Sequence, residues 1–220
     1  ELLEVFNKYC NSGKGTNDLI EEDYSPVRIV SLDSFRSGSY ALIVIVTMEN
    51  EQKRIIKIEG EFPIGDPPLE DQRKEYKIHS MVNRISGDIS PKLYFFKCIT
   101  ENEDLGTMLH NFSILELSRS DSLLADMKSL HLLLEEGKNV AISLTMMDYI
   151  EGLTLAEMIE RKPGKEIIPI LEDFRKKLNI LHNNHIYHCD LHENNIIVVG
   201  GTVRIIDFGT AIIMEQGVDL

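Results

Sequence analysis

Side chains that could bind a metal ion or move a proton are concentrated between residues 182 and 207. They are four histidines, one cysteine and two aspartates: His182, His185, His188, His192, Cys189, Asp190 and Asp207. Such residues can form a zinc site, but there is no His-Glu-x-x-His helix and the Cys/His spacing matches no zinc pattern. His182 and His185 are better interpreted as the end of a helix and its turn. A metal-hydrolase site is therefore the minor interpretation of this segment.

The spacing of Asn195 and Asp207 predicts that their side chains lie close together. The runs 196–199 and 203–206 are rich in β-branched residues, as strands are. Between them, the glycine pair 200–201 can adopt positive φ twice, which a tight hairpin requires. A hairpin of this length would bring the residues that flank it to the same cleft.

The run His188-Cys-Asp-Leu-His-Glu-Asn-Asn-Ile196, followed by Asp207-Phe-Gly209, resembles the protein-kinase-like superfamily. Asp190 and Asn195 stand at the interval of that family's catalytic loop, and Asp-Phe-Gly follows after one hairpin. The resemblance covers roughly residues 27–215. It implies a phosphotransferase that uses ATP and Mg²⁺. It also implies a two-lobed α+β fold, with a β-rich N-lobe and a mainly helical C-lobe that is truncated or minimal.

The resemblance assigns a role to each residue of these motifs. Asp190 is the catalytic residue, which would accept the proton of the attacking hydroxyl group. Asn195 and Asp207 would be the oxygen ligands of Mg²⁺, a hard cation that prefers them. His188 would be a structural histidine that packs against Phe208. Phosphoryl transfer needs alignment and neutralisation of charge more than covalent help, which explains these residue types.

The resemblance also assigns the ATP-binding residues. Lys57 would hold the α- and β-phosphates, and Glu75, 18 residues later, would be its ion-pair partner. Strand alternation places Lys57 beside Ile55 and opposite Ile56 and Ile58, and an inward-facing carboxylate needs a cation. The other assignments are Gly38 in the glycine-rich turn, Ile43 and Ile55 against the adenine, Met147 as gatekeeper, Asp148 and Ile150 in the hinge, and Ile197 as the floor.

Several positions depart from the family's pattern. The glycine-rich turn keeps one glycine of three, with Arg36 and Ala41 at the other two positions. Cys189 replaces an arginine that pairs with a phosphorylated activation loop, so we expect activity without prior phosphorylation. His192 replaces a lysine, as in the aminoglycoside-phosphotransferase-like, atypical-kinase and haspin-like branches. His79 stands where an apolar residue is usual.

The elements that position these residues follow from the periodicity of apolar residues. The pattern predicts strands at 27–32, 40–47, 54–59, 93–96 and 140–147, and helices at 69–86 and 167–183. The first three strands, separated by short turns, indicate an antiparallel meander. In the last helix, Ile170, Leu171 and Leu181 belong to a long apolar stripe.

The predicted domain organisation has three parts. Residues 1–26 are an N-terminal extension, residues 27–147 are the N-lobe, and residues 148–220 are the hinge and C-lobe. An insertion near 101–139 has no place in the resemblance, although it contains one helical pattern. Only 11 residues follow Gly209, so we expect either a fragment or a reduced kinase.

Composition argues against several other classes of protein. The 220 residues include 23 Lys+Arg and 36 Asp+Glu, a net charge of −13, which disfavours binding to nucleic acids and to anionic membranes. The longest apolar run, 41–46, is far shorter than the roughly 20 residues of a membrane helix. Three scattered cysteines favour a reducing cytoplasm, either the cell's own or that of a host.

We therefore predict an ATP-dependent phosphotransferase that acts on a serine or threonine hydroxyl of a protein. One alternative is a small-molecule kinase, which His192, Cys189 and the missing substrate-binding helices favour. Another is a pseudokinase that acts as a binding module, which the altered glycine-rich turn and the bulky Ile55 favour. The complete set of Lys57, Glu75, Asp190, Asn195 and Asp207 argues for an enzyme. Oligomeric state is left open.

Overall fold

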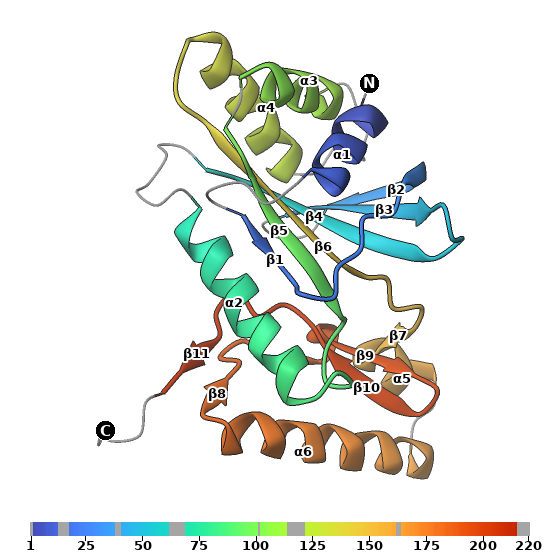
Figure 1. Cartoon of the computed structure of the whole chain (residues 1–220). Coiled ribbons are helices and arrows are strands. Elements are labelled where there is room, and N and C mark those ends of the chain that lie inside the picture. The colour runs from blue at the N-terminus through green and yellow to red at the C-terminus, as the bar shows by residue number, and fades with distance from the viewer. Residues whose placement is uncertain are drawn as a thin grey trace. The chain divides into compact units, whose positions relative to one another are not determined.

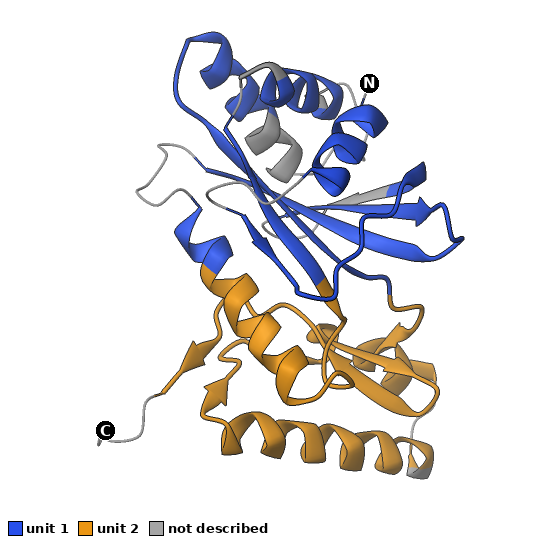
Figure 2. Ribbon diagram, in the orientation of Figure 1, with its two compact units in different colours: residues 1–73, 94–149 blue, residues 74–93, 150–220 orange. Residues whose placement is uncertain are grey.

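The chain divides into two compact units. The computed structural model describes residues 2–12, 18–37, 41–61, 69–100, 102–113, 122–161 and 164–214. Unit 1 comprises residues 1–73 and 94–149, and unit 2 comprises residues 74–93 and 150–220 (Figure 2). One of the boundaries, between Tyr149 and Ile150, falls in the segment predicted as the hinge.

Unit 1 is built on a six-stranded sheet of order β1-β5-β6-β4-β3-β2 (Figure 1). Its strands are β1 (Leu19–Ile20), β2 (Ile29–Ser37), β3 (Leu42–Met48), β4 (Lys53–Glu61), β5 (Leu93–Ile99) and β6 (Ala141–Asp148). β2, β3 and β4 pair antiparallel in sequence order, which confirms the predicted meander. β6 also pairs antiparallel with β4 and so places the end of β6 beside the start of β4.

Three helices of unit 1 pack on its sheet (Figure 1): α1 (Leu2–Asn11), α3 (Asn102–Ser113) and α4 (Ser122–Glu135). They bury Phe6, Leu109 and Phe112 completely, in one core with Val44 and Ile56 of the sheet. The insertion near 101–139 thus forms α3 and α4, which pack against each other and on this core. The N-terminal helix α1 belongs to the same core, into which it buries Leu2, Val5, Phe6 and Cys10.

A buried ion pair attaches the N-terminal segment to β5. Lys97 is fully buried, and its Nζ lies 3.1 Å from Asp18 Oδ2. The other carboxylate oxygen, Oδ1, accepts a hydrogen bond from the Cys98 backbone N–H at 3.0 Å. Removing one partner of such a pair leaves a buried charge without compensation, so the two residues depend on each other.

Unit 2 contains most of α2 (Glu70–Ile85) and the C-terminal part of the chain. Its elements are β7 (Leu153–Thr154), α5 (Leu155–Arg161), the 3-10 turn η1 (Lys165–Ile167), α6 (Ile168–Asn183), β8 (Ile186–Tyr187), the 3-10 turn η2 (Glu193–Asn195), β9 (Ile196–Val199), β10 (Thr202–Ile205) and β11 (Ile212–Ile213). The strands form two small sheets, β10-β9-β7 and β11-β8. α6 has a proline in its first turn and ends at Asn183, as predicted.

The burial of α6 differs from the prediction in one respect. Ile170 and Leu181 are buried, but Leu171, which belongs to the predicted stripe, is 43% exposed, while Lys177 is only 3% exposed. The stripe on α6 is therefore narrower than the hydrophobic pattern suggested. Lys177 is buried because acceptors far away in the sequence meet its ammonium group, which no local pattern reveals.

No helix in the described ranges combines the length and the apolar composition that crossing a membrane requires.

Gly152, just before β7, packs against the backbone of β9. A Cβ atom at this position would lie 2.6 Å from Val198 O and 2.7 Å from Ile197 Cγ2. We expect Gly152→Ala to lower the free energy of unfolding by about 2 kcal/mol, because the strand must move to admit the methyl group.

The matched control is Gly106→Ala in α3, where an added Cβ would meet no atom within 4 Å. This change should raise the free energy of unfolding by about 1 kcal/mol, because alanine favours a helix over glycine. Urea unfolding followed by circular dichroism measures both. Equal effects of the two substitutions would contradict the packing described for Gly152.

Candidate active site

The loop that carries Asp190 lies in unit 2, between β8 and η2. Asn195 is 7% exposed, and its Nδ2 donates a hydrogen bond to Asp190 O at 3.0 Å. The backbone N–H of Asn195 donates to His192 O at 2.9 Å. The Asp190 side chain is exposed. The loop therefore has a buried, fixed amide at one end and a carboxylate that solvent and a substrate can reach.

Phe208 is completely buried and contacts two histidine rings. The ring centroid of His188 lies 5.0 Å from that of Phe208, which confirms the predicted packing. His188 Nε2 lies 2.9 Å from Ile206 O, and since a carbonyl only accepts, Nε2 carries the proton. His188 is therefore held as a structural residue.

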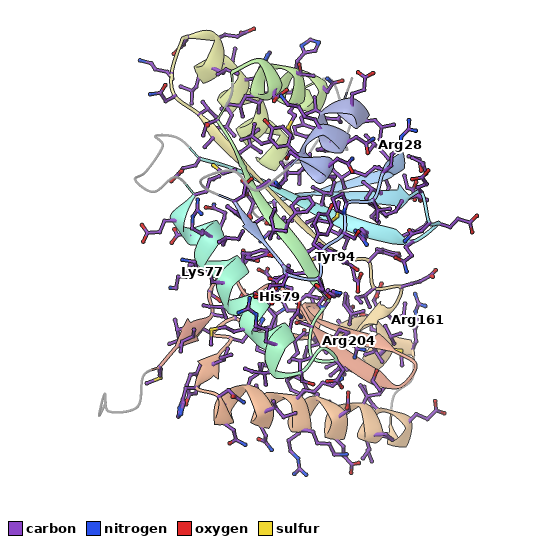
Figure 3. The ribbon with its side chains drawn as sticks, in the orientation of Figure 1. Arg28, Lys77, His79, Tyr94, Arg161 and Arg204 are labelled. Atoms are coloured by element: carbon purple, nitrogen blue, oxygen red, sulfur yellow. The ribbon has the colours of Figure 1, made fainter. Side chains whose placement is uncertain are left out.

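His79, on α2, is the second ring against Phe208, with the centroids 5.1 Å apart (labelled in Figure 3). Its Nε2 lies 2.9 Å from Pro91 O. This bond satisfies a polar atom of a ring that is 4% exposed. It explains how histidine is accommodated where the family resemblance led us to expect an apolar side chain.

Three hydrogen bonds join the Asp190 loop to the segment of Asp207. One is the bond between His188 Nε2 and Ile206 O; the second runs from Ile206 N to Asn195 O at 3.0 Å. In the third, Thr210 Oγ1 donates to His188 O at 3.0 Å. These hydrogen bonds join the two segments into one unit, which we call the frame, although 17 positions separate Asp190 from Asp207.

The predicted hairpin between Asn195 and Asp207 is present as β9 and β10. Val199 pairs with Thr202, and Ile196 pairs with Ile205. The two glycines between the strands have φ values of 58° and 84°, as a two-residue turn of this hand requires.

Two carboxylates line the space beside Gly209. A Cβ atom at Gly209 would lie 3.4 Å from Asp207 Oδ1 and 3.6 Å from Glu75 Oε2. Asp207 has a φ of 64°, and Cys189, next to Asp190, has a φ of 63°. Residues other than glycine adopt this conformation only at a cost, and it is concentrated at functional sites. Carboxylates brought together in this way favour a cation beside them.

The described residues contain no group of three or more His, Cys, Asp or Glu side chains that could hold a metal ion. His182 stacks on Tyr187, with the centroids 5.0 Å apart, and His185 has a φ of 58° in the turn after α6. These two histidines are the helix end and turn that the sequence indicated. The metal-hydrolase interpretation therefore gains no support from the described side chains.

A buried lysine anchors the hairpin to α6. Lys177 Nζ donates to Val203 O at 2.7 Å and lies 3.1 Å from Asp173 Oδ2. The same Asp173 oxygen accepts from Val203 N at 2.8 Å. Asp88 Oδ2 lies 3.3 Å from Lys177 Nζ, and Arg204 donates to Asp88 O at 2.6 Å. Sequence reasoning missed this group, because its members are far apart along the chain.

In unit 1, the register of the sheet brings four of the predicted ATP-binding residues to one face. Ile43 pairs with Lys57, and Ile55 pairs with Met147. Paired residues share a face, and residues two apart in a strand do too, so all four side chains lie together. All four are half-buried. The neighbours Val44, Ile56 and Met146 belong to the opposite face, which packs on the helices.

Sequence reasoning missed two residues near Lys57. Thr145 pairs with Lys57 across the strands and shares its face. Glu59 is 8% exposed, and its Oε1 lies 3.3 Å from Lys57 Nζ. Both could have been found from the strand period of two, since Thr145 precedes Met147 by two positions and Glu59 follows Lys57 by two. The predicted pairing of Lys57 with Glu75 stays a prediction.

The side chain of Asp148 is bound on the other face of the sheet. Tyr94 OH donates to Asp148 Oδ1 at 2.5 Å, and the Arg54 guanidinium lies 3.7 Å from the centre of the Tyr94 ring. Arg54 pairs with Asp148 across β4 and β6. Burial, together with the Asp148 carboxylate, raises the pKa of Tyr94 to about 12. Only the backbone of Asp148 is left for the hinge role that the resemblance assigns to it.

Three further predicted ATP-binding residues lie outside the strands β3, β4 and β6. Ile150 and Ile197 are half-buried residues of unit 2, and Ile197 pairs with Thr154. Gly38 lies outside the described residues.

A sequence profile of the protein kinase domain matches residues 92–220, more than half of the chain. The chain is 39% identical over 87 residues to the KEOPS complex subunit Bud32 of Pyrococcus abyssi, covering 38% of each protein. It is 34% identical over 87 residues to a probable serine/threonine-protein kinase of Clostridium perfringens, covering 38% of this chain and 13% of that protein. It is 33% identical over 79 residues to the serine/threonine-protein kinase PrkC of Bacillus subtilis, covering 34% and 12%. The aligned segments thus span well under two thirds of these relatives.

We expect Lys177→Met to lower the free energy of unfolding by about 2 kcal/mol, because it removes the buried ammonium group that binds Val203 O and the Asp173 carboxylate. Lys176→Met, at an exposed position one residue earlier, is the matched control and should change stability by less than about 0.5 kcal/mol. Urea unfolding measures both variants. Equal stability of the two would show that Lys177 does not anchor the hairpin.

Tyr94→Phe should change how stability depends on alkaline pH. The pKa of Tyr94 is about 12 in the folded chain and 10.0 in the reference state. The neutral form therefore stabilises the fold fully below pH 10, and this contribution is lost as the pH rises toward 12. The free energy of unfolding, measured in urea from pH 9 to pH 11.5, should fall less steeply in the variant.

The thiols of Cys10, which is buried, and Cys98, which is half-buried, titrate in the same range, since desolvation raises their pKa values to about 12 and 11. They are present in both proteins, so the difference between the two curves isolates Tyr94. Parallel curves would contradict the raised pKa.

Proposed function

Because the chain belongs to the protein kinase domain family, we propose that it transfers the γ-phosphoryl group of ATP to a serine or threonine hydroxyl of a protein. The frame of unit 2 carries this proposal: an exposed Asp190 carboxylate, a buried Asn195 and the segment of Asp207 joined by hydrogen bonds. Relatives named as serine/threonine-protein kinases support the choice of acceptor.

Asp190 would act as the base. Its carboxylate accepts the proton of the acceptor hydroxyl, whose oxygen forms a bond to the γ-phosphorus atom. The bond from that phosphorus to the oxygen shared with the β-phosphate breaks, and ADP leaves with the electron pair. The exposure of Asp190 fits this role, because the acceptor must reach it from solvent.

Asn195 and Asp207 would hold Mg²⁺, with Glu75 close to Asp207. Asn195 uses its amide nitrogen as a donor to Asp190 O, so its amide oxygen is the atom to offer a cation. The carboxylates of Asp207 and Glu75 line the space beside Gly209, and hard oxygen donors suit Mg²⁺. When bound, Mg²⁺ neutralises charge on the phosphate oxygens.

The ATP-binding residues are assigned from the pattern of the family. Lys57 is assigned to the α- and β-phosphates, with Glu75 as its ion-pair partner and Gly38 in the phosphate-binding turn. Ile43, Ile55, Met147 and Ile197 would supply the apolar surroundings of the adenine, and the backbone of Asp148 and Ile150 its hydrogen bonds. The shared sheet face of Ile43, Ile55, Lys57 and Met147 supports this assignment for unit 1.

A small alcohol is the alternative acceptor. His192 and Cys189 stand where protein kinases usually have lysine and arginine, and branches that act on small molecules share the histidine. A transfer assay that offers dephosphorylated casein and an aminoglycoside separately distinguishes the two acceptors.

Asp190→Ala should lower phosphoryl transfer from labelled ATP by about 100-fold or more, because the base is lost. Glu193→Ala is the matched control, since Glu193 is an exposed acid of the same loop. It should transfer phosphate at the wild-type rate. Equal background transfer by the wild type and Asp190→Ala would refute the enzymatic proposal.

A thermal-shift titration in the same buffers tests binding without chemistry. ATP with Mg²⁺ should stabilise the chain by about 2.7 kcal/mol at 100 times the Kd. Asp207→Ala should lose the part that depends on Mg²⁺. Stabilisation without transfer would identify a pseudokinase, and no stabilisation would remove ATP as the ligand.

A further inference from the structure

His192 begins the turn η2 and caps it with its own side chain. Its Nδ1 accepts a hydrogen bond from the backbone N–H of Asn194 at 3.3 Å. Its φ of −138° and ψ of 170° are the extended values of a capping residue. The backbone of the turn that carries Asn195 therefore orients the imidazole ring.

This hydrogen bond also decides where the proton of the ring lies. A backbone N–H only donates, so Nδ1 must be the acceptor and holds no proton. Nε2 is then the ring nitrogen that carries a proton. Nε2 lies 4.0 Å from Asp190 Oδ2. The contact therefore places an N–H group beside a carboxylate oxygen.

The distance of 4.0 Å is too long for a direct hydrogen bond, but it leaves room for one oxygen atom. An oxygen at about 2.8 Å from both Nε2 and Oδ2 would bond to each of them. It would have to accept from Nε2–H and donate to the carboxylate at the same time. A hydroxyl group has this combination of one donor and free acceptor sites.

We propose that His192 is a catalytic residue, whose Nε2–H donates a hydrogen bond to the acceptor hydroxyl while Asp190 Oδ2 accepts that hydroxyl's proton. The inference rests on the proposed phosphotransfer. The hydroxyl oxygen keeps one lone pair for the phosphorus atom and is oriented by two side chains from a single loop. Such orientation of a reacting group lowers the barrier by fixing it before the reaction.

A capping role alone does not account for histidine at this position. Asparagine, aspartate and serine cap such turns at least as well, with a shorter side chain. What the imidazole adds is reach: a second nitrogen beyond the capping atom, on the side of Asp190. The two functions of the ring can therefore be separated by substitution.

The test compares His192→Asn with His192→Gln in the full chain. Asparagine places an acceptor where Nδ1 lies and keeps the cap, but has no donor at the Nε2 position. Glutamine can place an N–H at the Nε2 position and has a poorer cap. Transfer from labelled ATP to dephosphorylated casein is measured with Mg²⁺, together with thermal stability and the KM for ATP. Glu193→Ala is the control for changes in the loop.

We expect His192→Asn to keep the wild-type melting temperature and KM for ATP and to lose about tenfold in kcat/KM for the acceptor. His192→Gln should melt lower yet transfer faster than His192→Asn. A purely structural cap predicts the opposite order. That opposite order, or full activity of His192→Asn, would overturn the inference.

Long-range ¹H–¹⁵N spectra of the histidine rings provide a readout without activity. The signals that disappear in His192→Gln should have the pattern of a neutral ring protonated on Nε2, and an Nδ1–H pattern would overturn the inference. If the wild type transfers no more phosphate than Asp190→Ala, the proposed function fails and the inference falls with it. If the wild type is active and His192→Asn equals it, only the inference fails.

Discussion

The burial of Phe208 is the constraint on which the candidate active site depends. Its ring is completely enclosed and contacts His188 and His79, while Asp207, one residue earlier, stays exposed. Asp207 itself takes a positive φ of 64°. Such a conformation costs of the order of 1–3 kcal/mol, and the burial of a phenylalanine is of similar size. The hydrogen bonds of His188 and Thr210 connect the segment of Phe208 to the loop of Asp190.

In unit 1 the corresponding constraint is the difference between the two faces of the sheet. One face is closed by α1, α3 and α4, whose side chains form a continuous apolar core with Val44, Ile56 and Met146. The other face can therefore carry a lysine among half-buried isoleucines without weakening the core. The hydrogen bond from Tyr94 to Asp148 lies on the face that the helices cover, so it holds the end of β6 without occupying the face of Lys57.

Two buried lysines of this acidic chain are paired with aspartates. Lys97 and Lys177 are at most 3% exposed, and each lies within 3.1 Å of an aspartate oxygen. Both connect segments that are distant in sequence, so the cations serve as ties between elements. The proposed binding of ATP to a protein with a net charge of −13 needs local cations, and Lys57, which lies beside Glu59, is the residue of unit 1 that we propose for this task.

What the sequence determined about this protein is the chemistry that depends on short intervals. Hairpins and strand periods are set by neighbouring residues, so they can be predicted from local sequence. These local features are the interval from Asp190 to Asn195, the glycine pair of the hairpin, the meander and the position of Lys57 in its strand. Tertiary structure decided the burial of Lys177 and His79, the place of α3 and α4, the exposure of Leu171 and the approach of the His192 ring to Asp190. These depend on which hydrogen-bond partners and apolar faces meet in space, and a one-dimensional pattern does not contain that information.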